Sequence, residues 1–225
     1  MQDEQDIFPQ KAQLWRGAIL HTIAHAIWIA SDPSLANILS WDGFNYNRQD
    51  DLGSRGTVTF MEDYVVGVFF DEHSARNPYH RGDAYDMQPF FKGMPPNLLT
   101  IANEHALQYV VDDYKGETVP VITASFWSNG EYLTAAEPWQ GVLTNGAHLV
   151  STEIMETDDA LAEWQIEYEF SAPQVALVQR LYQKRLAAET SVILNGQDRD
   201  EITTDGDEGI DEARELLVAV GIMMN

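Results

Sequence analysis

The sequence TVTFMEDYVVGVFFD, residues 57–71, decides the fold of this chain. Its two arms, 57–61 and 64–71, are rich in β-branched and aromatic residues, which favour β-strands. The acidic pair Glu62-Asp63 separates the arms, so we expect an antiparallel hairpin. A second hairpin is predicted over 119–135, where Ser128-Asn129-Gly130 forms the turn. Together the two hairpins predict an antiparallel sheet of about four to six strands.

Helical patterns flank these hairpins. Apolar residues recur at three- and four-residue spacing near 97–114, which predicts a helix. Near 10–30 the apolar residues go around most of the helical wheel, which predicts a second helix that is buried on several sides. Both helices are expected to pack on the sheet. The last third of the chain predicts three more helices, at 157–168, 172–188 and 210–220. Strands come early and helices late, without regular alternation, and this order indicates an α+β fold with a helical C-terminal third.

The sequence indicates the domain boundaries less clearly than it indicates the helices and strands. At this length one domain, 1–225, is the default, with a possible division into an α+β core, 1–150, and a helical appendage, 151–225. Residues 135–150 fit either a helix or a hairpin turning at Asn145-Gly146, and we favour the hairpin. The segment 77–96 is rich in proline, which predicts a long loop. A loop of this length either has a function or packs as an irregular segment against the rest of the chain.

The composition limits the kinds of partner. The chain carries 36 Asp and Glu against 13 Lys and Arg, a formal charge of −23, while 44% hydrophobic residues exclude a disordered acidic chain. The basic residues are scattered, so nucleic-acid phosphates and anionic membranes would be repelled. The acidity itself has three explanations: solubility, adaptation to high salt, or complementarity to a basic protein.

The cysteine count and the chain start bear on chemistry and location. There are no cysteines, which excludes disulfides, thiolate metal sites and a cysteine nucleophile. The start MQDEQD does not resemble a secretory signal, so we expect a cytoplasmic protein. The longest apolar run, 216–224, is well short of the ~20 residues that span a bilayer.

His21 and His25 form the most suggestive pair for metal binding. Residues four apart on a helix present both imidazoles to one face, as in zinc proteases. Position 22 is Thr22 rather than the glutamate that would act as general base, and the sequence marks no third ligand. A divalent metal such as zinc with a carboxylate from elsewhere is one interpretation. Two histidines at the rim of a buried helix that hydrogen-bond to loop carbonyls are the commoner one.

Two polar stretches are weaker candidates. One lies at the end of the 64–71 strand and contains Asp71, Glu72, His73, Ser74, Arg76, His80, Arg81 and Asp83. Neighbouring residues on a strand point to opposite faces and cannot form a catalytic triad among themselves. A solvated loop whose Arg76 and Arg81 pair with nearby carboxylates is the simpler interpretation. The other, 203–214, resembles a calcium loop but lacks its first ligand, its glycine and its closing glutamate. Phosphate-loop, dinucleotide-binding and nucleophile-elbow motifs are absent from the sequence.

Aromatic residues interleaved with acids suggest a docking surface. Rings would supply buried area and carboxylates would supply rate and selectivity toward a basic partner. The candidate residues are Trp41, Asp42, Tyr46, Asp50, Asp51 and Glu131. The sequence therefore predicts first a non-enzymatic acidic binding protein with no catalytic residues, and an inhibitor or immunity-type protein is the form of it that we consider. The alternatives are a metal-dependent hydrolase that uses His21 and His25, and a housekeeping protein whose acidity serves only solubility.

Overall fold

The computed structural model describes residues 7–81 and 84–224. The chain forms two compact units, each made of two stretches of sequence. Unit 1 comprises Met1–Leu14 and Phe44–Ile154, and unit 2 comprises Trp15–Gly43 and Met155–Asn225. The sequence suggested a division at 150/151. The second unit begins its C-terminal part close to that point but also includes a stretch near the N-terminus.

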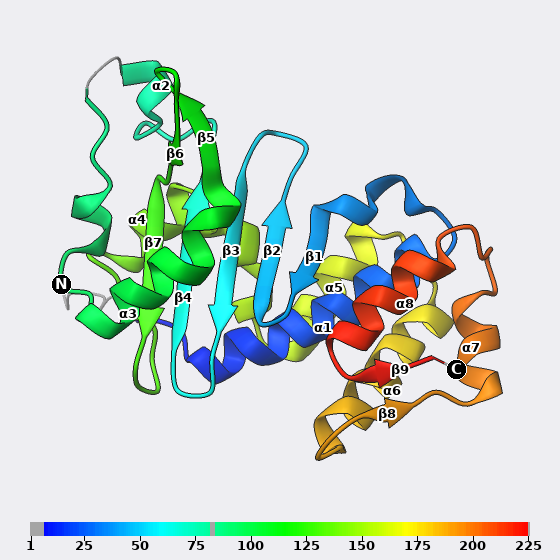
Figure 1. The fold of residues 1–225 in the computed structure, drawn as a ribbon. Coiled ribbons are helices and arrows are strands. Elements are labelled where there is room, and N and C mark those ends of the chain that lie inside the picture. Colours follow the sequence, from blue (N-terminus) through cyan, green and yellow to red (C-terminus); the bar gives the residue numbers. More distant parts are fainter. Residues whose placement is uncertain (1–6, 82–83, 225) are drawn as a thin grey trace, which may run out of the picture. The chain divides into compact units, whose positions relative to one another are not determined.

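The main sheet has the strand order β1-β2-β3-β4-β7 (Figure 1). Its strands are β1 (Leu39–Asp42), β2 (Asn45–Gln49), β3 (Arg55–Phe60), β4 (Val65–Phe70) and β7 (Ala124–Ser128). The described pairings of β2, β3, β4 and β7 are all antiparallel. This arrangement, with helices packed on the sheet, confirms the predicted α+β fold and the 57–71 hairpin.

Unit 1 buries both faces of β4. Val66 and Val68 belong to a core with residues of the segment 91–110, which covers one face. On the other face Phe69 packs against Phe126 of β7, with ring centroids 5.5 Å apart. Gly67 lies against the Phe126 ring so closely that a Cβ there would be 2.5 Å from a ring atom. The all-buried pattern of β4 is thus explained by layers on both of its sides.

The segment that covers β4 is made of several short helices of different types. It contains η2 (Gln88–Phe91), α3 (Pro96–Ile101), the π-helix η3 (Ala102–Ala106) and η4 (Leu107–Val110). The predicted helix 97–114 therefore ends four residues early, because Val111–Tyr114 is strand β5, which pairs with β6 (Glu117–Pro120). Lys115 and Gly116 both have positive φ at the turn of this hairpin, as a tight two-residue turn requires.

Two predictions about 119–150 are corrected. The strand predicted over 119–127 is divided between β6 and β7, and its return arm makes only isolated bridges, one of them between Trp127 and Thr134. The hairpin favoured for 135–150 is wrong. This segment forms α4 (Trp139–Thr144) and η5 (Ala147–Val150), and Gly146 at φ 136° ends the first helix instead of turning a hairpin. A short helix, α2 (Pro78–Arg81), begins the predicted loop 77–96.

Unit 2 is mainly helical. It holds most of α1 (Lys11–Ile29), together with η1 (Pro33–Ile38), α5 (Thr157–Glu167), α6 (Ala172–Ala187), α7 (Gly196–Ile202) and α8 (Ile210–Ala219). A small parallel pair joins β8 (Val192–Ile193) to β9 (Ile222–Met223). The predictions of α1, α5, α6 and α8 are confirmed. The sequence missed α7, where Asn195 and Asp198 form a capping box. Over 41–56 the sequence indicated loops around at most one short strand, and this stretch contains β2 and the end of β1.

Within 7–81 and 84–224, no helix is both long enough and apolar enough to span a bilayer.

Candidate partner-binding site

The acids predicted to dock a partner do not form one patch. Asp50 and Asp51 follow β2 at the end of the sheet where Arg55 pairs with Phe70. Glu131 follows β7 at the other end, where Val65 pairs with Ser128. The six residues of β3 separate the two ends by about 17 Å at ~3.4 Å per residue. A partner at one end would feel charges at the other only weakly, since salt screens over ~10 Å at 0.1 M.

The aromatic members of the predicted set are also dispersed. Tyr46 is fully buried, and its hydroxyl donates a 2.7 Å hydrogen bond to the buried carboxylate of Glu153. It cannot be a docking anchor in this conformation, which corrects that prediction. Trp41 and Asp42 belong to unit 2, where Trp41 is half-buried and its indole N–H donates to Thr22 Oγ1 at 2.9 Å.

His21 and His25 lie in the interior of unit 2. Both are essentially inaccessible, and the Tyr168 hydroxyl lies 2.7 Å from His21 Nε2 and 3.4 Å from His25 Nδ1. His21 also stacks on Trp164, with centroids 4.5 Å apart. Among the residues whose positions are described, no group of three His, Asp or Glu side chains could hold a metal ion. The described neighbours of the two histidines are thus aromatic rings and the Tyr168 hydroxyl. These neighbours add no support to the hydrolase hypothesis.

Carboxylates do gather at the Asp50 end of the sheet. A Cβ placed on Gly53 in the β2–β3 turn would lie 3.0 Å from Glu72 Cβ, so the turn and the end of β4 are adjacent. Arg55, the first residue of β3, donates a 2.7 Å hydrogen bond to Asp112 of the β5–β6 hairpin. The resulting group, which we call the acidic edge, consists of Asp50, Asp51, Glu72, Asp112, Asp113 and Glu117. Figure 1 shows the β2–β3 turn and the β5–β6 hairpin at the same end of unit 1.

The charges of the acidic edge are partly balanced from within. Burial raises the pKa of Asp112, but the Arg55 guanidinium and the Asp113 amide outweigh it and hold that pKa below the ordinary value. Asp50 lies 3.7 Å from His148. The side chains of Asp51, Asp113 and Glu117 are exposed, and these three are the acids most accessible to a partner.

Tyrosines lie beside the acidic edge. Tyr79, which is 42% exposed, packs edge-on against Tyr114 of β5 with centroids 5.5 Å apart. Tyr85 contacts the same Tyr114 ring at 5.8 Å. The pKa of Tyr79 is raised by partial burial and by the Asp112 carboxylate. The hairpin thus presents aromatic area and negative charge together, a combination that suits a protein interface.

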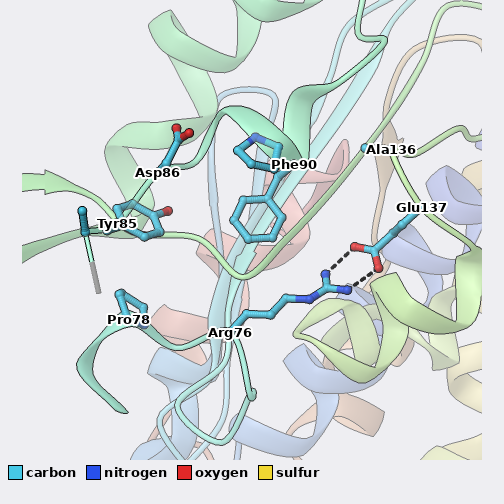
Figure 2. Close-up of a pocket in the computed structure, with 9 residues that line it drawn as sticks. Arg76, Pro78, Tyr85, Asp86, Phe90, Ala136 and Glu137 are labelled. Atoms are coloured by element: carbon cyan, nitrogen blue, oxygen red, sulfur yellow. Dashed lines mark hydrogen bonds and ion pairs between the residues drawn. The ribbon is translucent and has the colours of Figure 1, made fainter. Parts of the chain in front are cut away.

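A pocket of unit 1 opens next to this tyrosine group. It has a volume of about 410 Å³, within the range of ligand sites. Arg76 and Glu137 form a two-pronged ion pair in its wall, and the Arg76 guanidinium lies 5.8 Å from the Phe90 ring centre. Tyr85 and Asp86 contribute an aromatic ring and an exposed carboxylate. Figure 2 shows Tyr85 and Asp86 on one side of Phe90 and Glu137 on the other.

A buried polar network fixes the wall of the pocket. Ser74 donates to Asn145 Oδ1 at 2.6 Å and accepts from the Arg76 amide at 3.0 Å. Thr123 Oγ1 accepts from the Asp71 amide, and the Thr123 carbonyl accepts from Arg76. Asp71 and Ser74 are therefore structural and buried, not part of a solvated loop. Arg76 does pair with a carboxylate, as expected for that loop, but Glu137 comes from 61 residues away.

The remaining residues of the predicted 71–83 cluster lie at the surface or outside the description. Glu72 and His80 form an exposed pair at 3.6 Å, and His73 is exposed. The side chain of Arg81 and the residue Asp83 lie outside the described part. Sequence reasoning missed the pocket because Tyr85, Asp86 and Glu137 carry no local motif. The only signal was the unusual length of the 77–96 loop.

Comparison of the chain with protein-family models, with curated proteins and with solved structures found no match.

Proposed function

We propose that this chain is an acidic binding protein that docks on a basic protein partner through the acidic edge and its tyrosines. The observation that carries the proposal is the coincidence, on the β5–β6 hairpin, of exposed carboxylates with aromatic rings, in a chain of charge −23. Rim carboxylates accelerate association with a basic surface, and rings supply the buried area that holds it.

An inhibitor or immunity-type role, in which the acidic edge covers a basic active site in the cytoplasm, is the form of this function that the sequence suggested. The charge supports it, since an acidic protein associates fast with a basic one. The chain itself would then need no catalytic residues.

The experiment compares two variants that change the net charge equally. Asp51→Asn, Asp113→Asn and Glu117→Gln together neutralise exposed acids of the acidic edge. Glu62→Gln, Asp63→Asn and Glu131→Gln neutralise three exposed acids at the opposite end of the sheet. Binding of a fluorescein-labelled peptide of alternating arginine and glycine is measured by fluorescence anisotropy at several salt concentrations, with an alternating glutamate and glycine peptide as control.

We expect the first triple variant to lose about tenfold in affinity, because exposed charge pairs are worth ~0.2–1 kcal/mol each. The opposite-end variant should keep most of its affinity, and binding should weaken as salt rises. Equal losses in the two variants would mean that only the total charge matters. That result would overturn the proposal in favour of acidity that serves solubility.

A further inference from the structure

We infer that the pocket formed by Arg76, Tyr85, Asp86, Phe90 and Glu137 receives an arginine side chain. The inference rests on the proposed function in one respect, that the arginine is supplied by the basic partner.

The pocket already holds one guanidinium in this manner. Arg76 lies over the Phe90 ring and makes a two-pronged pair with Glu137, the geometry in which proteins bind guanidinium groups most strongly. The positive charge of Arg76 also balances the negative charge of Glu137. The wall is thus built from groups that suit a flat, delocalised cation.

The rest of the pocket repeats these elements without a cation of its own among the described lining residues. Tyr85 supplies a second ring, held rigidly because its hydroxyl donates to the Ile122 carbonyl and accepts from the Ile122 amide. Asp86 supplies a second carboxylate, and only its Oδ1 is used by the Gln88 amide, at 2.9 Å. An entering guanidinium could stack on Tyr85 and hydrogen-bond to Asp86 while its apolar stem contacts Pro89.

The charge around the pocket argues for a cation over an anion. Arg76 and Glu137 compensate each other, so Asp86 leaves the described lining residues with one negative charge in excess. The pocket also adjoins the acidic edge, since Tyr85 packs on Tyr114 of the β5–β6 hairpin. Arginine fits better than lysine, because only a planar guanidinium combines ring stacking with two parallel hydrogen bonds to a carboxylate.

The test uses Nα-acetyl-arginine N-methylamide, whose only charge is the guanidinium, and its lysine counterpart. Each is titrated into ¹⁵N-labelled protein, and amide shifts are followed by NMR. The key variant is Asp86→Asn, which removes the charge but keeps an oxygen for the Gln88 amide. Glu62→Gln, an exposed acid at the far end of the sheet, is the matched control.

We expect saturable shifts at Tyr85, Asp86 and Phe90 with the arginine compound, weaker binding of the lysine compound, and about tenfold weaker binding of arginine to Asp86→Asn. Glu62→Gln should bind like the wild type. No saturable shift, or equal binding by Asp86→Asn, would overturn the inference, and equal affinity for lysine would overturn its selectivity for arginine.

The two proposals fail in different ways. If the acidic-edge triple variant weakens peptide binding while Asp86→Asn leaves the arginine compound unaffected, the pocket inference is wrong and the proposed function stands. If Asp86→Asn weakens binding of the arginine compound but the two triple variants bind the peptide equally, the pocket is an arginine site and the proposed function is wrong.

Discussion

Tyr85 and Ile122 exchange two hydrogen bonds. The Ile122 amide donates to the Tyr85 hydroxyl at 2.6 Å, and the hydroxyl donates to the Ile122 carbonyl at 3.1 Å. The side chain of Tyr85 thereby ties the loop around the pocket to the residue two positions before β7. Burial raises the pKa of Tyr85 to about 12.

This pKa predicts how stability changes in alkali. The folded pKa lies above the unfolded value of 10.0, so the unfolded chain loses the proton first. The contribution of Tyr85 is complete below pH 10 and declines as pH rises toward 12. The ultraviolet absorbance of the wild type is titrated with alkali, and that of Tyr85→Phe is subtracted at each pH. This difference should show a transition near pH 12. A difference transition near pH 10 would contradict the assignment.

Tyr85→Phe also tests the hydrogen bonds at neutral pH. The buried Ile122 amide would lose its acceptor, which should cost about 1–3 kcal/mol in the free energy of unfolding, measured with urea. Tyr132→Phe is the comparison, because Tyr132 is 51% exposed and its loss should be small. Equal stability of the two variants would indicate that the two hydrogen bonds between Tyr85 and Ile122 contribute nothing to stability.

Glu137→Gln should loosen the pocket wall. It removes the charge that faces Arg76, whose side chain is 30% exposed while that of Glu137 is 20% exposed. Because the pair is two-pronged but not fully buried, we expect a loss of about 1–2 kcal/mol in urea denaturation. Glu104→Gln, which changes an exposed acid elsewhere in unit 1, should be close to neutral.

Asp198 makes unit 2 sensitive to acid. Burial raises its pKa, but Lys184, the Asn195 backbone and Arg180 together outweigh burial and hold the pKa below the ordinary value. A lowered folded pKa gives a stability contribution that is present above the unfolded value of 3.8 and is lost as pH falls through the folded pKa. Asp198→Asn should therefore cost about 1–3 kcal/mol at neutral pH.

The difference between Asp198→Asn and the wild type should shrink below pH 3.8, as measured by urea denaturation across a pH series. Glu201→Gln, which changes a less buried partner of the same Arg180, should have a smaller effect at neutral pH. A pH-independent difference for Asp198→Asn would contradict the linkage.

Gly67→Ala should destabilise unit 1 by about 1–3 kcal/mol, because the added methyl would overlap the Phe126 ring in a closely packed core. Gly130→Ala is the matched control, since a Cβ at Gly130 meets nothing within 4 Å. Thermal unfolding followed by circular dichroism compares them. Similar melting temperatures would mean that the Phe126 ring moves aside at little cost.

Local patterns predicted the elements whose residues repeat regularly. The 57–71 hairpin was predictable from β-branched residues, and α6 from the capping-box pattern of Ser171 and Gln174. The sequence failed where a tertiary partner decides the conformation. Val111–Tyr114 continues a helical pattern but becomes a strand because β6 pairs with it, and 135–150 is helical although Asn145-Gly146 is a common hairpin turn.

The candidate site was less predictable than the fold. Whether Asp51 and Glu131 share a surface depends on strand order, which spacing along the chain does not contain. Tyr46 looked like an exposed ring among acids, yet its hydroxyl meets Glu153, 107 residues away, in the interior. The pocket joins Arg76 to Glu137 across 61 residues, so no local window of sequence holds both.

The discontinuity of unit 2 has a consequence for biosynthesis. His21 on α1 meets Tyr168 beside α5, and 147 positions separate the two residues. At ~5–20 residues per second, the ribosome needs roughly 7–30 s to add that length of chain. During that interval the apolar surface of α1 is translated but its partner helices do not yet exist. The nascent chain therefore carries a hydrophobic helix without its unit 2 partners while most of unit 1 is still being made, and this helix is a segment that a chaperone would need to shield.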